Sequence, residues 1–173
     1  LLKALRHLEL DLPWEAQLYG SLEEHPDYGR QIVEEVKHWP QAKVALMGVF
    51  PPDNIYAVLA RIDLLVIPSL WRENSPLILL QALASGLPIL ASEVDGMADQ
   101  LHPGRDSALF PPGDDRELAS WLRRFLREPE ALAQLCGNGG QPRTVSDYVD
   151  QLEVEYAFSL RNSSGKPGRL QTP

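Results

Sequence analysis

A continuous apolar run of strand length places the strongest limit on what this chain can fold into. The run lies within residues 63–69 (DLLVIPS) and shows no alternation of polar and apolar side chains. Strands that read this way are covered on both faces, as in parallel sheets. Further short runs that we read as buried strands lie at 16–20, 43–48, 88–91 and 108–110.

The segments between these runs carry helical patterns. The clearest is 114–126, where Leu118, Trp121, Leu122 and Phe125 recur at the spacing of one helix face. The other predicted helices are 1–9, 26–39, 55–60, 76–85, 129–136 and 144–160. Strands that alternate with helices predict an α/β fold with a doubly wound, Rossmann-like parallel sheet.

The length of 173 residues fits one domain of about 100–200 residues. We assign residues 1–160 to that domain, with 144–160 as its closing helix. Residues 161–173 are polar and contain Gly and Pro, so we expect a disordered tail. The first residue is Leu rather than Met, so we expect the chain to be a piece of a longer polypeptide.

Charge and composition exclude several classes of function. The formal net charge is −8 and no basic stripe is visible, so we expect no nucleic-acid partner. The single cysteine, Cys136, rules out an internal disulfide and a cysteine-based zinc site, and it fits a reducing, cytoplasmic compartment. The four histidines are scattered without metal-ligand spacing, and we predict no metal site. No apolar run reaches the length of about 18 residues that a transmembrane helix needs.

In a parallel sheet of this kind, ligands bind beyond the carboxyl ends of the strands. Those ends fall here at Gly20, Gly48, Pro68–Ser69 and Ala91–Ser92. Glycine and serine at these positions suit a close approach of the backbone to a ligand. They suit ordinary strand-to-helix turns equally well, and the pattern alone does not choose between the two.

The helix at 76–85 carries the most information about chemistry. We expect Ser75 as its N-cap, Pro76 as its first residue and Gly86 just past its end. It is apolar on every side, which is typical of a buried helix. Gln81 is its one large polar side chain. A buried amide needs a partner, which could be backbone, water or a ligand.

Glu73 stands just before this helix and has two open interpretations. It could be a surface charge near a cap, or a carboxylate directed at sugar hydroxyls. The free N–H groups of the first helical turn can hold a phosphate. Together these features suit a phosphorylated ligand that is rich in hydroxyl groups.

A series of short motifs, in one order along the chain, resembles a known family. The motifs are DLLVIPS (63–69), ENSP (73–76), QALASGLPILAS (81–92), DGM (95–97), LFPPGD (109–114) and RTVSDY (143–148). The series resembles the donor-binding, C-terminal half of retaining GT-B glycosyltransferases. It is most similar to glycosyltransferase family 4, also called glycosyl transferases group 1, and the resemblance covers residues 1–160.

The resemblance implies roles for particular residues. Glu73, Asn74 and Ser75 would bind the donor sugar, and Gln81 would bind the ribose of the nucleotide. Backbone N–H groups of Ser75 and Leu77 would hold the diphosphate. The edge of the sheet that contains Gly48 and Phe50 would receive the base, although Phe50 could equally be a core residue.

The sequence also departs from the family pattern. The family uses a carboxylate where this chain has Gln81, and a neutral amide implies weaker nucleotide binding. Asp95-Gly96 replaces the usual Gly-Gly, and Asp99 stands where Glu is common. Pro76 lacks the N–H that another residue would contribute to the phosphate site.

The resemblance also implies missing parts. The family's domain opens with a strand and with an Arg and a Lys that neutralise the leaving diphosphate, and this chain begins after them. The missing first strand would lie between the strands at 16–20 and 63–69. We expect either that the 173-residue piece is unstable alone, or that these two strands close the gap.

The implied function is that of a donor-domain fragment, inactive alone, of a retaining hexosyltransferase-type enzyme. The enzyme would transfer a sugar from a UDP-, GDP- or ADP-sugar to a glycan or lipid acceptor, in polysaccharide biosynthesis. It needs no metal or other cofactor. The acceptor would bind through the absent N-terminal domain, and any peripheral membrane contact would not involve this domain. One alternative is a non-catalytic nucleotide- or sugar-binding scaffold module, and a weaker one is a GT-B epimerase.

Overall fold

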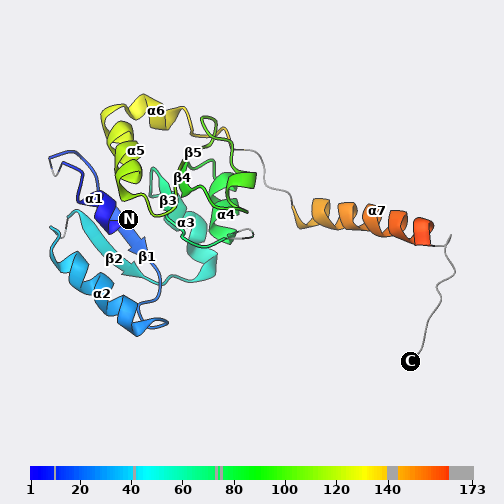
Figure 1. Cartoon of the computed structure of the whole chain (residues 1–173), viewed down its shortest axis with the longest axis horizontal. Helices are drawn as coiled ribbons and strands as arrows, with labels where there is room; N and C mark the ends of the chain where they lie inside the picture. Colours follow the sequence, from blue (N-terminus) through cyan, green and yellow to red (C-terminus); the bar gives the residue numbers. More distant parts are fainter. Residues whose placement is uncertain (10, 41, 73, 75, 140–143, 164–173) are drawn as a thin grey trace. The chain divides into compact units, whose positions relative to one another are not determined.

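The computed structural model describes the whole chain except residues 10, 41, 73, 75, 140–143 and 164–173 (Figure 1). The chain divides into two compact units, Leu1–Gly140 and Gln141–Pro173. The first unit contains every described strand, and the second contains one long helix.

The strands of the first unit are all parallel, which confirms the predicted sheet type. Strands β1 (Ala16–Tyr19) and β2 (Val44–Gly48) form one sheet. Strands β3 (Leu65–Ile67), β4 (Ile89–Ser92) and β5 (Ser107–Phe110) form a second sheet in that order. Among the described residues no ladder joins β1 to β3. The expectation that these two strands close the gap is therefore wrong.

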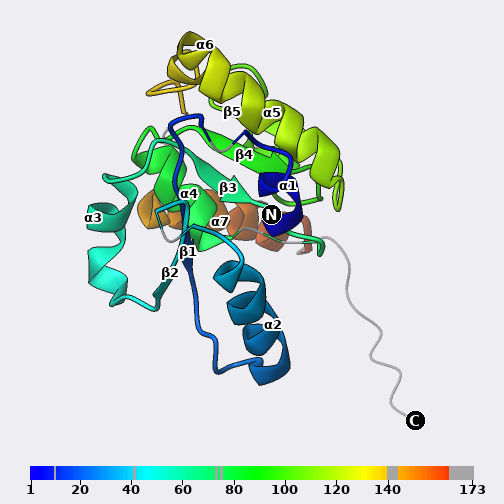
Figure 2. The same ribbon diagram turned by 90° about the vertical axis from the view of Figure 1, so that its left-hand side faces the viewer.

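Helices follow the strands as the alternation predicted (Figures 1 and 2). The first helix is shorter than expected, because α1 spans only Leu2–Leu5. The backbone N–H groups of His7 and Leu8 then donate hydrogen bonds to the carbonyls three residues before them, which continues the turn. The remaining helices of this unit are α2 (Pro26–Lys37), α3 (Ile55–Leu59), α4 (Leu77–Ala84), α5 (Asp115–Arg127) and α6 (Pro129–Ala133), with 3-10 turns η1 (Pro52–Asn54) and η2 (Ala98–Gln100).

The second sheet is covered on both faces. Leu90 of β4 packs with Leu118 and Phe125 of α5, whereas its neighbour Ile89 packs with Leu79 of α4. Successive side chains of a strand point to opposite faces, so α4 and α5 lie on opposite sides of the sheet (Figure 2). This is the doubly wound arrangement. All four residues of β4 are buried, as the sequence predicted for such strands.

Strand β3 departs from that prediction. Its three residues, which lie in the continuous apolar run at 63–69, are only half-buried. The reason is its position: β3 pairs with β4 along one edge, and its other edge has no ladder partner among the described residues.

A third cluster of buried side chains supports the first sheet. Leu2, Leu5 and Leu8 follow the predicted helical spacing and pack with Trp14 and Val44. The rings of Trp14 and Trp39 meet edge to face at 5.8 Å.

The second unit contains α7, Val145–Ser163. The helix was predicted at 144–160, so three residues assigned to the tail belong to it. Thr144 and Asp147 cap its start reciprocally, because each side chain accepts a hydrogen bond from the other's backbone N–H. The single-domain boundary at 160 stays a prediction, and the rest of the tail lies outside the described residues. No helix in the described part of the chain is long and apolar enough to cross a membrane.

Candidate functional site

The carboxyl ends of β1 and β2 bring two of the predicted glycines together. The Gly20 N–H donates to the Gly48 carbonyl at 3.0 Å. Gly20 has φ +147° and Gly48 has φ +70°, so both adopt backbone conformations that favour glycine. A Cβ at either position would meet no atom within 4 Å. The space beside this edge is therefore open.

Phe50 follows Gly48 and lies at the same edge. Its ring meets the Tyr19 ring edge to face, with centroids 5.4 Å apart and planes at 87°. Phe50 is half-buried and belongs to none of the three core clusters of the described residues. A core role for Phe50 is thus weaker than the sequence allowed, and its half-buried ring lines a cleft.

The segments after β3 and β4 are linked by an ion pair that the sequence analysis missed. Arg72 Nε lies 3.1 Å from Asp95 Oδ2, and the two side chains are 87% and 72% exposed. Exposed pairs of this kind contribute at most about 1 kcal/mol to stability. The signal in the sequence was a pair of opposite charges just beyond the ends of two neighbouring strands.

Helix α4 begins one residue later than expected. Pro76 is its N-cap, with extended backbone, and Leu77 is its first residue. Proline suits this place because its fixed φ and missing N–H do not interrupt a helix that has not begun. Glu73 and Ser75, predicted for the donor sugar and the phosphates, lie outside the described residues. Asn74 is described and exposed.

The far end of α4 confirms the predicted glycine. Gly86 has φ +67°, and its N–H donates to the Leu83 carbonyl at 3.0 Å. The Leu87 N–H donates to the Ala82 carbonyl at 3.1 Å. These two bonds are the Schellman motif, which ends helices in the left-handed conformation.

The expectation that α4 is buried on every side is wrong. Leu79 is fully buried, whereas Leu77 is 73% exposed and Gln81 is half-buried. Leu77 and Gln81 are four residues apart and so lie on one face of the helix, away from the buried face that packs on β4. Because Gln81 is not fully buried, water can satisfy its amide and a ligand is not required.

One predicted strand-end residue is fully buried and unsatisfied. Ser92, the last residue of β4, has no exposed surface, and its Oγ has no hydrogen-bond partner in the described part of the chain. An unpaired buried hydroxyl costs about 1–3 kcal/mol. Because Ser92 has no exposed surface, its hydroxyl is not available to a ligand at the open edge where Gly20, Gly48 and Phe50 lie.

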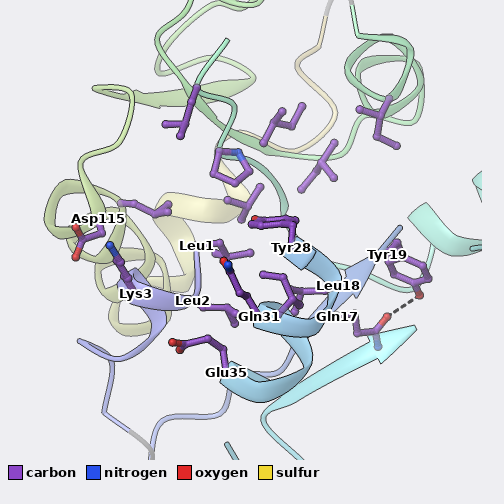
Figure 3. Close-up of a pocket in the computed structure, with 18 of the residues that line it drawn as sticks. Leu1, Leu2, Lys3, Gln17, Leu18, Tyr19, Tyr28, Gln31, Glu35 and Asp115 are labelled. Carbon is purple, nitrogen blue, oxygen red and sulfur yellow. Dashed lines mark hydrogen bonds between the residues drawn. The ribbon is translucent and has the colours of Figure 1, made fainter. Parts of the chain in front are cut away.

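A large cleft lies beside β1 and β3. It has a volume of about 1530 Å³ and is lined by β1 and β3, with Phe50, Leu70, Ile78 and Gly113 among its walls. Figure 3 shows Leu18 of β1 and Gln31 of α2 around it. The cleft brings Phe50, the end of β1 and the first turn of α4 to one space. Among the described residues, no group of three or more His, Cys, Asp or Glu side chains could hold a metal ion.

Comparison with known proteins identifies relatives over most of the chain. Residues 1–128 match the family described as Glycosyl transferases group 1. The chain is 32% identical over 131 residues to exopolysaccharide phosphotransferase SCO2592 of Streptomyces coelicolor, covering 73% of this chain and 14% of that protein. It is 31% identical over 150 residues to the MMP alpha-(1->4)-mannosyltransferase of Mycolicibacterium hassiacum, covering 84% and 34%.

Solved structures show the same fold. HepE from Anabaena, in complex with UDP, superposes with a TM-score of 0.76 at 21% identity; the match covers 94% of this chain and 44% of that one. A complex of HepE with UDP-glucose gives a TM-score of 0.74. The neighbours are GT-B proteins, so the two parallel sheets with flanking helices are a Rossmann-like part of that fold. The chain spans less than half of the length of each of these relatives.

Proposed function

Because this chain belongs to the Glycosyl transferases group 1 family, we propose that it is the donor-binding part of an enzyme that transfers sugar from a nucleotide-sugar to a hydroxyl acceptor. One observation supports this most: Phe50, Tyr19 at the end of β1 and Ile78 in the first turn of α4 line one cleft, and the positive-φ glycines Gly20 and Gly48 stand at the ends of β1 and β2. These are the groups that a nucleotide-sugar needs for close approach, stacking and phosphate binding.

In this proposal each part of the donor has its own contacts. The base lies against Phe50, beside Gly48 at the end of β2. The ribose hydroxyls contact Gln81 on the outer face of α4. The diphosphate accepts hydrogen bonds from the backbone N–H groups of Ser75 and Leu77, and the sugar contacts Glu73, Asn74 and Ser75.

We propose transfer with retention and without a metal ion. The bond between the sugar C1 and the diphosphate oxygen breaks, and a bond from C1 to the acceptor oxygen forms on the same face. The acceptor proton passes to the departing diphosphate. The protein supplies electrostatic stabilisation of the leaving group rather than a nucleophile. In this proposal the acceptor site and the remaining catalytic groups lie elsewhere in the full-length protein. A cytoplasmic location, with or without peripheral contact to a membrane, is likewise proposed for the full-length protein.

Gln81 supports a second candidate, a binding or scaffold module with a weakened donor site. An amide at this position can accept one hydrogen bond from a ribose hydroxyl, but it lacks the charge that roughly doubles the strength of such a bond. The two candidates differ in nucleotide affinity and in turnover.

Calorimetric titration of UDP, GDP and ADP into the full-length protein tests the proposal. We expect one nucleotide to bind, Gln81→Glu to tighten it about tenfold, and Glu73→Ala to reduce transfer from the matching nucleotide-sugar. Gln134→Glu makes the same charge change at an exposed position outside the cleft and should leave affinity unchanged. If every variant has the Tm of the parent protein and no nucleotide binds, the assignment of the donor site is wrong. The scaffold module is then the better candidate.

A further inference from the structure

Trp71 is the most exposed of the four tryptophans in the chain. Its side chain is 76% exposed, whereas Trp14 is buried and Trp39 and Trp121 are half-buried. Its neighbour Leu70 is 66% exposed. Exposed apolar side chains that adjoin one another mark interaction sites more often than single ones do. The core packing that explains the other tryptophans does not explain Trp71.

The position of Trp71 separates it from the cleft. Leu70 and Trp71 follow the carboxyl end of β3, the edge at which a parallel sheet binds ligands. Leu70 lines the cleft, and its Cδ2 lies 3.7 Å from the place that a Cβ on Gly113 would take. Trp71 is not among the described residues that line the cleft. Its ring is therefore open to a second molecule, separate from one that fills the cleft.

Polar side chains lie next to this exposed ring. Arg72 follows Trp71 in the chain, and its Nε lies 3.1 Å from Asp95 Oδ2. The Arg72 and Asp95 side chains are 87% and 72% exposed. A guanidinium carries several N–H donors and a carboxylate carries acceptor oxygens, so a pair as exposed as this one offers both to a ligand. Asn74, which is also exposed, adds an amide nearby in the sequence.

Asp95 stands on a loop that is anchored in the core. Val94 and Met97, before and after it, are buried in the cluster on the α4 side of the second sheet. The Met97 N–H donates to the Val94 carbonyl at 3.3 Å, which closes the turn around Asp95. By pairing with Arg72, the carboxylate restrains the segment that carries Trp71. A surface that is held in place before a ligand arrives loses less entropy on binding.

The combination of groups selects among the possible occupants. A further protein domain would bury the Arg72–Asp95 pair, and charged residues are depleted in the buried core of such interfaces. A phosphate or another anion would be repelled by the Asp95 carboxylate. A neutral sugar ring has hydroxyl groups that both donate and accept, and a face of C–H groups that an aromatic ring can cover. Only the sugar uses the ring and both charged side chains.

We propose that Trp71 and the Arg72–Asp95 pair bind a neutral sugar ring, and that this ring belongs to the acceptor. The indole covers the C–H face, Arg72 donates hydrogen bonds to hydroxyl oxygens, and Asp95 accepts them from hydroxyl groups. The assignment to the acceptor rests on the proposed function, in which the donor occupies the cleft and its sugar contacts Asn74. An acceptor at Trp71 is then close to the donor C1, as transfer requires. The acceptor is accordingly a carbohydrate.

Saturation-transfer NMR on the full-length protein tests the sugar contact. The probes are methyl β-D-glucopyranoside, methyl β-D-galactopyranoside and methyl α-D-mannopyranoside, with cyclohexanol as a ring of similar size that lacks the further hydroxyl groups. We expect at least one glycoside to receive saturation at its ring C–H hydrogens. Trp71→Ala should raise its Kd about tenfold or more, and Trp71→Phe should raise it less. Tyr56→Ala removes another exposed aromatic ring, on α3, and should leave the Kd unchanged.

The ion pair is tested in the same titrations. Arg72→Ala and Asp95→Ala should each raise the Kd of the glycoside about two- to tenfold, because each removes hydrogen bonds to hydroxyl groups. Arg72→Lys keeps a charged donor and should lose less. Unchanged affinity in both alanine variants would remove the pair from the site.

A competition experiment separates the acceptor from the donor sugar. UDP-glucose, GDP-mannose and ADP-glucose are added in turn to the protein with its glycoside. Retention of the Trp71-dependent signals while one nucleotide-sugar binds supports an acceptor site, whereas their loss would assign Trp71 to the donor sugar. If none of the three binds and the Trp71-dependent signals remain, the proposed donor site is wrong and the sugar contact stands.

Three outcomes overturn the proposal. The first is that no glycoside gives a signal that Trp71→Ala weakens. The second is an equal Trp71-dependent signal from cyclohexanol, which would make the surface apolar rather than specific for sugar. The third is a lower Tm in Trp71→Ala without any effect on glycosides, which would mean that another part of the full-length protein covers the ring.

Discussion

The rings of Tyr19 and Phe50 meet edge to face, with centroids 5.4 Å apart, at the carboxyl edge of β1 and β2. This contact holds Phe50 beside Gly48 and leaves the phenyl ring half-buried at the wall of the cleft. An aromatic ring fixed by a neighbour loses little side-chain entropy when a flat ligand stacks on it.

Phe50→Ala should therefore weaken nucleotide binding in the full-length protein. Stacking of a base on an aromatic side chain is worth about 1–3 kcal/mol, so we expect the Kd to rise roughly tenfold or more. Phe50→Tyr keeps the ring and serves as the control in the same titration. Equal affinities for all three proteins would remove Phe50 from the base site.

Gly86→Ala should destabilise the first unit. A non-glycine residue at φ +67° costs about 1–2 kcal/mol. The added Cβ would also lie 3.2 Å from Gly137 Cα, which tightens this contact. Thermal unfolding followed by circular dichroism should show a lower Tm, with a smaller loss for Gly86→Asn because Asn tolerates this conformation. An unchanged Tm in Gly86→Ala would contradict the Schellman ending of α4.

Asp114→Ala should destabilise α5 by about 1 kcal/mol, because it removes an N-cap. The Asp114 carboxylate accepts from the backbone N–H groups of Arg116 and Glu117 at 3.0 and 2.9 Å. Asp114→Asn preserves an accepting oxygen and should lose less. Urea unfolding of the three proteins measures the difference, and equal midpoints would show that the cap contributes nothing.

Stability should fall in acid partly through Asp115. A hydrogen bond from His7 holds the pKa of the Asp115 carboxyl below its ordinary value of 3.8. A carboxyl whose pKa is lower in the folded state stabilises the fold above its unfolded pKa and loses that contribution as pH falls through the folded value. The Tm should drop below about pH 4, and less steeply in Asp115→Asn than in the parent. Parallel curves for the two proteins would contradict this role.

The sequence predicted the strands and their parallel pairing because short apolar runs and intervening helical periods are local signals. It also placed Gly86 correctly, since a glycine after the last helical residue has a specific backbone cause. The burial of α4 was overestimated for a different reason. The sequence shows that Leu77 is apolar, but only the packing of α4 on β4 decides which face of the helix is buried.

The candidate site was predictable to a smaller extent. Gly20, Gly48 and Phe50 meet at one edge, as the strand ends indicated. The Arg72–Asp95 pair was missed because its members come from different strand ends and have no local pattern in common. The half-burial of Gln81 also depends on how neighbouring elements pack, which periodicity does not report.

The separation of the two sheets has a consequence for how the first unit opens. The β1–β2 sheet rests on its own cluster around Trp14, whereas β4 is buried between α4 and α5. Such clusters fluctuate as distinct cooperative units. Limited proteolysis should therefore cut first in the segments that flank β1 and β2, while β3 to β5 survive as a resistant remnant. Helix α5 also contributes Leu122 and Leu126 to the Trp14 cluster. It would therefore respond both to the opening of the β1–β2 sheet and to that of the sheet formed by β3 to β5.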